Sequence, residues 1–355
     1  MTKHIPVILY GVGGVGRALL RQILNGRSIT ADRNQLHFDI VALTDSRNWQ
    51  SDLDGLKDEQ IQTILNAKEQ GQQWGEDRPS NLEILNLLQA VGLPSALVVD
   101  VTAQDGMEPV IDQALAYGYG VVLANKKPLA GPWETAARYY NNPLIRHEST
   151  VGGGQPVIAT LRYLLDTNDP PDLIEGQLSG TLGYICGRLE EGAPFSTAVS
   201  EAKAKGYTEP DPREDLGGLD VMRKVMILGR MAGWPLETAD IEVEALYPSH
   251  LAGISVGDFM GAIAEMDGSI RERVEAAKAN GNVLRYSAEV TEQGGSVGLK
   301  PISKESPLAN LKYISFRTKF YCDQPMMIGG KGAGVEMTAA GVLGDMIGVV
   351  REKAA

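Results

Sequence analysis

Cysteine, histidine and long apolar runs are scarce in this chain of 355 residues. The two cysteines and four histidines show no metal-ligand spacing, which argues against a disulfide framework and against a zinc-dependent dehydrogenase. No apolar run approaches the roughly 20 residues that a membrane-spanning helix needs. The opening MTKHIPVILYG leads into a strand pattern without a cleavage region. We therefore expect no signal peptide and a location in the reducing cytoplasm.

Positive charge is also in the minority. Lys and Arg number 33 against 45 Asp and Glu, so the formal net charge is −12. Such a surface repels phosphate groups, and we expect neither nucleic acid nor an anionic membrane as a partner. The hydrophobic content of 43% is ordinary for a globular protein. The length suffices for two domains with separate cores.

A glycine-rich turn follows the first apolar run of the chain. Residues 5–10 lead into GVGGVG, and the next stretch, RALLRQILNG, has a helical pattern. Strand, turn and helix form the context in which G-x-G-x-x-G binds a dinucleotide, with the phosphates at the helix N-terminus. We therefore predict a nucleotide cofactor, NAD or NADP, that contacts Gly11, Val12, Gly13, Gly14, Val15 and Gly16.

The second predicted strand covers residues 38–44 and ends at two charged side chains that favour different cofactors. Asp45 is placed to accept a hydrogen bond from the ribose 2′-hydroxyl of NAD, whereas Arg47 is placed to bind the 2′-phosphate of NADP. The sequence leaves this choice open. Residues 48–80 are polar, and we expect them to form a helical excursion on the surface.

Alternating strands and helices resume after residue 95. We expect strands at 96–101, 120–124 and 144–147, and helices at 108–117 and 133–141. Ligands bind at the carboxyl ends of parallel strands. We therefore predict Thr102 beneath the nicotinamide ribose and Lys126 at the edge of the cofactor. The alternative for Lys126 is an exposed lysine without a role.

A dense glycine loop, HESTVGGGQP, occupies residues 147–156. Its carbonyl oxygens are the ligands that Na⁺, Mg²⁺ or Ca²⁺ accepts, and a hinge between domains is compatible with the same sequence. From about residue 157, helices mix with alternating strands, which is typical of an α+β domain. The sheet of that domain also offers a surface for a homodimer.

These patterns predict an α/β protein of two domains. Residues 1–150 form a Rossmann-type nucleotide-binding domain with a parallel sheet. Residues 151–328 form an α+β domain for substrate binding, catalysis and dimerisation. The segment 329–355 has a second glycine-rich turn and a helix, and we expect it to return to the first domain and close over the cofactor.

The stretch GYTEPDPREDLGGLDVMRKVMILGR at 206–230 is unusually rich in charge. Its apolar residues recur at helical spacing from Leu219 onward, and Asp220 and Lys224 lie four apart beside that stripe. A solvated helix face with an ion pair is the simpler interpretation. The other interpretation is a site for a small zwitterion, to which Tyr207, Glu209 and Asp215 of the preceding loop would also contribute.

Together these blocks resemble the homoserine dehydrogenase family, and the resemblance covers nearly the whole chain. Two blocks, HESTVGGGQP at 147–156 and GYTEPDPREDLGGLDVMRK at 206–224, are long, ordered and specific to that family. They favour the zwitterion site over a bare ion pair. The blocks are GVGGVG at 11–16, NKKPLA at 125–130, HESTVGGGQP at 147–156, SGTLGYI at 179–185, GYTEPDPREDLGGLDVMRK at 206–224 and GAGVEMTAAGVLGDMI at 332–347.

The resemblance implies NAD(P)-dependent reduction of L-aspartate 4-semialdehyde to L-homoserine, in a form without a C-terminal regulatory domain. Lys126 and Lys224 match the lysines near the reacting carbonyl, with Asp220 as the acidic partner and Glu209 holding the substrate ammonium. Which lysine donates the proton stays open. Further matches are Thr102 and Gly334 as cofactor contacts, and Glu148, Val151, Gly153 and Gln155 as ligands of a monovalent cation, Na⁺ or K⁺.

Gln155 is polar where relatives often carry an apolar residue, a departure that bears on the cation site. Two other functions remain. A reductase of another small amino-acid aldehyde or 2-oxo acid would turn over that compound and not homoserine. A catalytically silent NAD(P) sensor would bind the cofactor without turnover.

Overall fold

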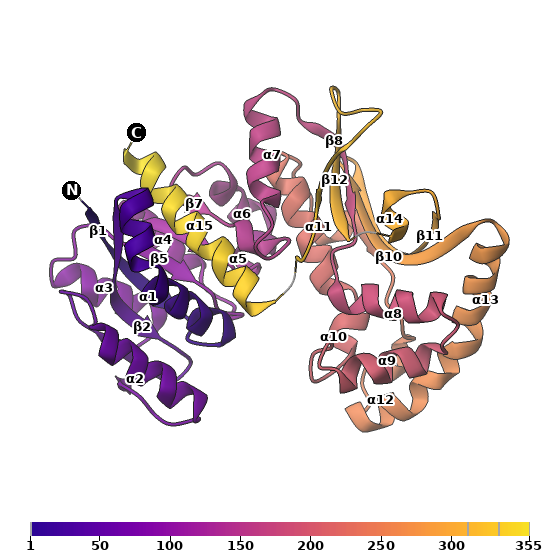
Figure 1. Ribbon diagram of the computed structural model, residues 1–355, viewed down its shortest axis with the longest axis horizontal. Coiled ribbons are helices and arrows are strands. Elements are labelled where there is room, and N and C mark those ends of the chain that lie inside the picture. Colours follow the sequence, from indigo (N-terminus) through magenta and orange to yellow (C-terminus); the bar gives the residue numbers. More distant parts are fainter. Residues whose placement is uncertain (1, 311, 333, 355) are drawn as a thin grey trace. The chain divides into compact units, whose positions relative to one another are not determined.

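The computed structural model describes residues 2–310, 312–332 and 334–354, and it consists of two compact units (Figure 1). Unit 1 comprises Met1–Pro156 and Ala333–Ala355, and unit 2 comprises Val157–Gly332. These bounds lie within a few residues of the expected ones. Ala333, in the closing glycine-rich turn, lies outside the described residues.

Unit 1 is built on a seven-stranded sheet in the order β4-β3-β2-β1-β5-β6-β7. The five strands from β2 to β7 in this order are parallel, and β3 and β4 add an antiparallel edge. The strands are β1 (Lys3–Tyr10), β2 (Leu36–Thr44), β3 (Asn48–Ser51), β4 (Glu76–Asp77), β5 (Leu97–Asp100), β6 (Gly120–Leu123) and β7 (Ile145–Arg146).

Parallel strands that helices cover on both faces consist of nearly continuous apolar residues. This is why β1, β5 and β6 could be predicted from the sequence. Every residue of β5 and β6 is buried. The helices of this unit are α1 (Gly14–Asn34), α2 (Asp58–Glu69), α3 (Asn81–Ala90), α4 (Glu108–Ala116), α5 (Lys127–Ala130), α6 (Trp133–Tyr140), the 3₁₀ turn η1 (Glu148–Thr150) and α15 (Val335–Ala354).

The helix expected within residues 48–80 is present as α2, but the prediction that the segment is a surface excursion was wrong. The segment contributes β3 and β4 to the sheet, and α2 buries Ile61 and Leu65 in the core together with Trp74 from the following loop. The segment is mostly polar, so the sequence pattern did not reveal that these few apolar residues are buried. Its strands are also too short to show a period of two.

Helix α15 returns to unit 1, as predicted for the C-terminal segment. It packs on α1, β6 and η1, and Val342, Met346 and Val349 from it are fully buried in the core of the unit. The nucleotide-binding unit is therefore discontinuous in sequence. No helix of the described residues combines the length and the apolarity needed to cross a membrane.

Unit 2 contains a six-stranded sheet in the order β13-β12-β8-β10-β11-β9. All pairings are antiparallel except that of β9 with β11, so the predicted α+β domain with a mixed sheet is confirmed. The strands are β8 (Pro171–Gly176), β9 (Ile241–Val243), β10 (Asn282–Thr291), β11 (Gly294–Ser303), β12 (Tyr313–Thr318) and β13 (Met326–Gly329).

Helices α8, α11 and α13 all contact the central strand β10. The helical segments of unit 2 are α7 (Val157–Asp166), α8 (Gly180–Glu190), α9 (Phe195–Ala204), α10 (Arg213–Leu216), α11 (Leu219–Met231), α12 (Val256–Ala262), α13 (Asp267–Ala279), α14 (Pro307–Asn310), η2 (Thr238–Asp240), η3 (Ser249–Leu251) and η4 (Ile263–Met266).

Candidate active site

The glycine-rich turn of unit 1 has the conformation that its sequence requires. Gly11 has φ +106°, a value that favours glycine, and a Cβ there would lie 3.1 Å from the Val101 carbonyl carbon. A Cβ on Gly16 would overlap the Gly11 carbonyl oxygen, whereas one on Gly13 would meet nothing within 4 Å. Gly13 thus leaves open space beside the N-terminus of α1, where free N–H groups favour an anion.

The carboxyl ends of β5 and β6 are tied together by a buried carboxylate that the sequence analysis missed. Asp100 Oδ1 accepts hydrogen bonds from Thr102 N at 2.9 Å and Thr102 Oγ1 at 2.7 Å, and Oδ2 accepts one from Asn125 Nδ2 at 3.0 Å. Asn125 in turn donates to Gln104 O at 2.8 Å. Burial raises the pKa of Asp100, against the hydrogen bonds that lower it.

This network fixes the positions of Thr102 and Lys126. Lys126 directly follows Asn125, whose Oδ1 accepts a hydrogen bond from Lys127 N at 3.1 Å, and it caps the short helix α5. Both predicted residues therefore stand at the strand ends where the fold binds ligands. Only the Asp at the end of an apolar strand run hinted at the network in the sequence.

Asp45 is enclosed by the chain itself and only 9% of its side chain is exposed. Oδ1 accepts hydrogen bonds from Arg47 N and Asn48 N, and Oδ2 from Lys68 Nζ at 2.6 Å and Trp74 Nε1 at 3.0 Å. Burial raises the pKa of Asp45, but these hydrogen bonds outweigh it and hold the pKa below its usual value. The guanidinium of Arg47 is exposed and has no partner among the described residues.

The loop after β7 packs closely against α15. Glu148 N donates to Asp345 Oδ2 at 2.7 Å, and Ser149 Oγ donates to Thr338 O at 2.8 Å. A Cβ on Gly341 of α15 would overlap Ser149 Oγ and lie 2.8 Å from the Gly153 oxygen. Two helix turns of α15 thus hold the loop that was predicted to bind a cation.

The donor set of this loop fits a hard cation. Gly152 and Gly153 have φ +78° and +64°, which turns the backbone sharply at the predicted carbonyl ligands. Among the described residues, Gln155 Nε2 is buried without a hydrogen-bond partner. The oxygen and nitrogen of a glutamine amide can be exchanged by rotating the group. In the rotated form, Oε1 of Gln155 takes the position of Nε2 and offers a cation one more oxygen ligand.

In unit 2, Lys224 is held at two of its three N–H positions. Its Nζ lies 2.7 Å from Asp220 Oδ2 and donates to Leu178 O at 2.8 Å. Both charged residues lie on α11, whose Val221, Val225 and Leu228 are buried as the apolar period predicts. Only 18% of the Lys224 side chain is exposed, against 48% for Asp220. Leu178 was not predicted, because it contributes through its main chain.

The loop before α11 gathers the other predicted residues. Asp215 Oδ2 accepts a hydrogen bond from Glu209 N at 2.8 Å, and Thr181 Oγ1 donates to Tyr207 O at 2.6 Å. The Tyr207 ring also packs edge-on against Tyr184, with centroids 5.0 Å apart. Burial raises the pKa of Asp215, and the hydrogen bonds from Glu209 N and Thr181 oppose that effect. The Glu209 side chain is exposed and has no partner among the described residues.

Arg213 fastens this loop to the segment between η3 and α12. Its Nη1 donates to the carbonyl oxygens of Leu251, Ala252 and Ile254, at 3.1, 2.9 and 2.7 Å. Its other nitrogens bind Asp211, and the guanidinium stacks 5.3 Å from the Phe259 ring centroid. Arg213 lies within the charged stretch 206–230, but nothing in the sequence pattern predicts these contacts.

The structure thus forms two clusters from the predicted residues. In unit 1 the glycine-rich turn, Thr102 and Lys126 stand at strand ends of one sheet, and the glycine loop lies against α15. In unit 2 Asp220 and Lys224 pair on α11, Asp215 lies on α10, and the segment before α10 carries Tyr207 and Glu209. The two lysines belong to different units.

Comparisons with known proteins agree with this division. Residues 11–141 match the model of the NAD-binding domain of homoserine dehydrogenase, and residues 156–347 match the homoserine dehydrogenase model. A bifunctional aspartokinase/homoserine dehydrogenase from Haemophilus influenzae is 34% identical over 97% of this chain and 43% of its own length. The chain spans about two fifths of the length of such curated relatives.

Two solved structures share the fold over nearly the whole of both chains. A protein of unknown function from Candida auris has a TM-score of 0.86 and 30% identity, covering 98% of this chain and 99% of its own. The structure named a putative homoserine dehydrogenase from Archaeoglobus fulgidus has a TM-score of 0.74 and 25% identity, covering 97% and 98%.

The fold and the strand-end cluster define a protein with a Rossmann-type NAD-binding domain joined to an α+β unit. The two family models together cover most of the chain, so the fold class and the resemblance found in the sequence are both confirmed. The chain belongs to the homoserine dehydrogenase family.

Proposed function

We propose that this protein interconverts L-homoserine and L-aspartate 4-semialdehyde with NAD(P)(H). The observation that carries the proposal is the environment of Lys224, whose ammonium group is held by Asp220 and Leu178 O. An ammonium carries three donors, and the third has no partner among the described residues. That donor is available to the oxygen of a substrate.

When bound, NAD(P)(H) would supply or accept the hydride at the substrate carbon. As the aldehyde is reduced, negative charge builds up on its oxygen, and Lys224 stabilises this charge and gives up a proton to it. In the oxidation direction the neutral amine takes the hydroxyl proton. Asp220 keeps the amine oriented throughout. We assign the proton to Lys224, and Lys126 to positive charge at the cofactor end.

An amino-acid substrate also needs a partner for its own ammonium group. The free carboxylate of Glu209 supplies one, and its backbone is fixed by the bond from Glu209 N to Asp215. Tyr207, packed on Tyr184, forms the exposed apolar border beside it. A plain alcohol would have no use for this carboxylate.

The test measures oxidation of L-homoserine by NAD(P)⁺ at alkaline pH in wild type and Lys224→Met, which keeps the stem and removes the ammonium. We expect the variant to lose about 10³-fold in kcat, in line with the effect of a general acid–base group. Lys205→Ala is the matched control, because Lys205 is an exposed lysine at the edge of the same loop. Its kcat should equal that of wild type.

Two outcomes would oppose the proposal. Turnover of another small amino-acid aldehyde or 2-oxo acid, with none of homoserine, would reassign the substrate. Cofactor binding that raises the melting temperature without turnover of any of these compounds would indicate a sensor.

We further propose that NADP(H) is preferred over NAD(H). The Asp45 carboxylate is already occupied by Lys68, Trp74 and two backbone amides, which opposes its use for a ribose hydroxyl. Arg47 is exposed and free to bind a 2′-phosphate. Arg47→Gln should lower kcat/KM for NADP⁺ at least tenfold and leave that for NAD⁺ unchanged. Arg33→Gln, at the exposed end of α1, serves as control.

We also propose a monovalent cation, Na⁺ or K⁺, held by Glu148, Val151, Gly153 and Gln155. The turn at two left-handed glycines and the unpartnered amide of Gln155 support it. Rates should rise with NaCl or KCl relative to tetramethylammonium chloride at equal ionic strength. Gln155→Leu should raise the cation concentration needed for half-activation, whereas the exposed Gln293→Leu should not. Identical rates in all three salts would count against the site.

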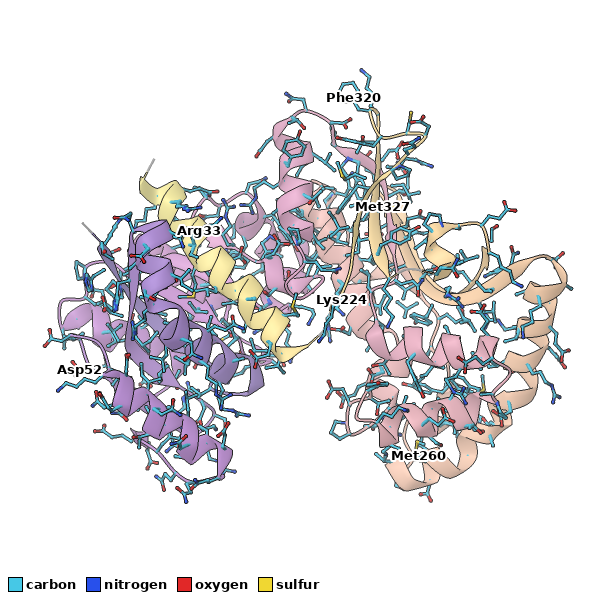
Figure 2. All side chains as sticks on the ribbon, in the orientation of Figure 1. Arg33, Asp52, Lys224, Met260, Phe320 and Met327 are labelled. Carbon is cyan, nitrogen blue, oxygen red and sulfur yellow. The ribbon has the colours of Figure 1, made fainter. Side chains whose placement is uncertain are left out.

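We propose, finally, a cytoplasmic homodimer associated through the sheet of unit 2. Its edge strand β13 and the turn before it expose Met327 and Phe320 (Figure 2). Sedimentation equilibrium should give a dimer for wild type and a monomer for Phe320→Lys/Met327→Lys. Ile29→Lys removes an equally exposed apolar side chain from unit 1 and should leave the dimer intact.

A further inference from the structure

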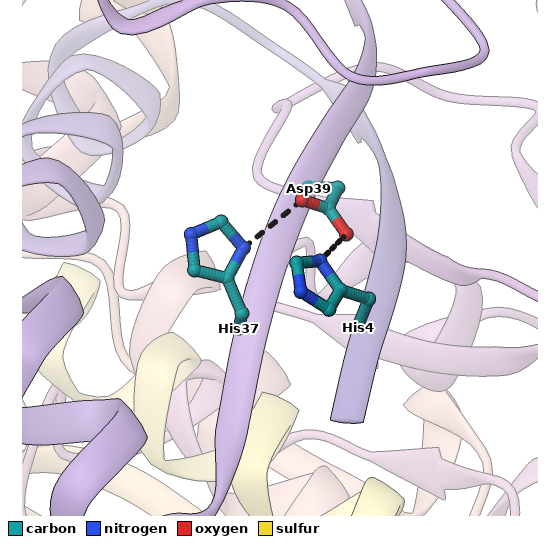
Figure 3. Close-up of side chains that lie close together, drawn as sticks. All are labelled: His4, His37 and Asp39. Carbon is teal, nitrogen blue, oxygen red and sulfur yellow. Dashed lines mark hydrogen bonds and ion pairs between the residues drawn. The ribbon is translucent and has the colours of Figure 1, made fainter. Parts of the chain in front are cut away.

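Two histidines and an aspartate meet at the start of the first two strands of unit 1 (Figure 3). His4 Nδ1 lies 2.9 Å from Asp39 Oδ2, and His37 Nδ1 lies 2.9 Å from Asp39 Oδ1. The potential ligand atoms of the three residues all lie within 4.8 Å of one another. Among the described residues this is the one group of three or more such side chains that is close enough to share a metal ion.

The register of the parallel strands creates the cluster. His4 on β1 is paired with His37 on β2, and Asp39 follows two residues later, on the same face as His37. The imidazole rings stack with centroids 4.8 Å apart. The side chains remain accessible, with 66% of His4, 28% of His37 and 20% of Asp39 exposed. An ion therefore has a path from solvent and room for water ligands.

We propose that His4, His37 and Asp39 form a binding site for a divalent transition-metal ion such as Zn²⁺. Two imidazole nitrogens and one carboxylate are a donor set that Zn²⁺ and Co²⁺ accept, with water completing a tetrahedron. Both Nδ1 atoms already point at the carboxylate, so an ion replaces two N–H···O contacts. The single negative charge of Asp39 balances part of the charge of the ion.

Arg27 of α1 opposes the ion. Its Nη1 lies 3.0 Å from His37 Nε2 and also donates to Phe38 O, while Nη2 pairs with Asp58 at 2.7 Å. A guanidinium only donates, so His37 Nε2 accepts and the ring proton sits on Nδ1. Coordination through Nδ1 moves that proton to Nε2, where it faces Arg27. Metal binding thus requires the Arg27–His37 bond to break.

No such obstacle exists at His4. Its Nε2 has no partner among the described residues, so the ring changes tautomer freely. The site joins the amino ends of β1 and β2, whereas the glycine-rich turn follows the carboxyl end of β1. The ion would therefore link the amino ends of two neighbouring strands, at the end of the sheet opposite to the predicted cofactor site. It stabilises unit 1 and leaves the rate of the reaction unchanged.

The test uses full-length protein without a histidine tag, freed of metal with EDTA and titrated with Co²⁺. We expect one Co²⁺ per chain with the intense visible bands of tetrahedral coordination, displaced by Zn²⁺. His4→Ala should weaken binding at least tenfold, and His4→Ala/His37→Ala should abolish it. Arg27→Met removes the competing donor and should tighten binding several-fold.

His250→Ala is the matched control, because His250 also pairs with a carboxylate, Glu265, at 2.9 Å and is 64% exposed, but has no second histidine. Binding in this variant should equal that of wild type. On wild type, NMR of the imidazole carbons should show Zn²⁺ shifting the signals of His4 and His37, which needs no substitution.

The proposal is overturned if wild type gives no tetrahedral Co²⁺ bands, or if the double variant keeps them. Loss of the bands in His250→Ala would also overturn it. An unchanged affinity in Arg27→Met would refute the competition between the guanidinium and the ion.

Discussion

At the scale of single residues, Arg213 makes contacts that no other side chain of the segment before α11 replaces. One guanidinium serves three carbonyl oxygens and Asp211 at once. A lysine keeps the charge but has a single nitrogen on a flexible stem, so it cannot reproduce the planar set of donors. Under the proposed function, we expect Arg213 to act by holding the segment that carries Glu209 and Asp215, and not by contact with the reacting groups.

We predict that Arg213→Lys raises the KM for L-homoserine about tenfold, because the loop that carries Glu209 loses part of its anchoring. A tenfold change corresponds to about 1.4 kcal/mol of binding free energy. The kcat and the KM for the cofactor should stay near wild type. Steady-state kinetics with each substrate varied gives all three constants. Arg271→Lys, an exposed arginine on α13, is the control. A fall in kcat at constant KM would assign Arg213 a different role.

His147 is a second residue whose effect can be tested, through the pH dependence of the free energy of unfolding. It is buried, and burial lowers its pKa to about 4. In the unfolded chain a histidine titrates near 6.5. Between these values the unfolded state binds more protons, so the free energy of unfolding falls as the pH drops from about 6.5 towards 4. The total loss attributable to His147 is about 3 kcal/mol.

His147→Phe removes this proton and keeps a ring against Tyr140, which His147 meets edge-on. The stability of the variant relative to wild type should therefore improve steadily from pH 7.5 to pH 4.5. Urea unfolding across that range measures the difference. A constant difference between His147→Phe and wild type across this range would contradict the assignment.

At the scale of elements, the docking of α15 depends on where glycine stands along one helix. Gly341 faces the loop 148–154 without room for a Cβ, whereas nothing lies within 4 Å of a Cβ on Gly344. Both positions gain helix propensity on substitution by alanine. The difference between the two variants therefore isolates the close approach of the helix to the loop.

We predict that Gly341→Ala lowers the free energy of unfolding by about 1–3 kcal/mol, the usual cost of an overpacked contact. Gly344→Ala should be neutral or stabilising by up to about 1 kcal/mol. Thermal and urea unfolding of both variants decides between them. If the two variants have equal stability, the loop yields to the helix and the contact has no structural importance.

At the scale of the whole molecule, the two units differ in how they use the chain. Unit 2 is continuous, whereas unit 1 needs α15 from the far end of the sequence. Ala339, Val342, Met346, Val349 and Val350 of that helix lie in its core. Residues 1–156 on their own would expose this apolar surface to water, at roughly 25 cal/mol for each Å².

We predict that residues 157–332 fold alone with a cooperative transition and that residues 1–156 alone do not. Joining 1–156 to 334–355 through a short Gly-Ser linker should restore a folded unit that binds the cofactor. The linker is feasible because a Cβ on Gly154 would overlap the Met337 carbonyl oxygen, so the two segments meet. Circular dichroism and cofactor-dependent melting measure the outcome. Folding of 1–156 without α15 would refute the prediction.

Local patterns were enough to predict the Rossmann and α+β architecture, the family, and the positions of Lys224 and Asp220 on one helix. Glycines, apolar periods and i, i+4 spacing act within one turn or one strand, so the sequence displays them directly. The enclosure of Asp45 by Lys68 and Trp74 was not visible in this way. Nor were the buried Asp100 and the two strands in residues 48–80.

The meeting of His4, His37 and Asp39 also depended on the tertiary structure alone. Each of these features is set by the register of strands and by packing between distant segments. Spacing along the chain carries no record of such contacts, because a shift of one residue in register would turn His37 and Asp39 to the other face. Most local elements and the family could thus be predicted from the sequence, whereas the packing of those elements decided which charges are occupied and which are free.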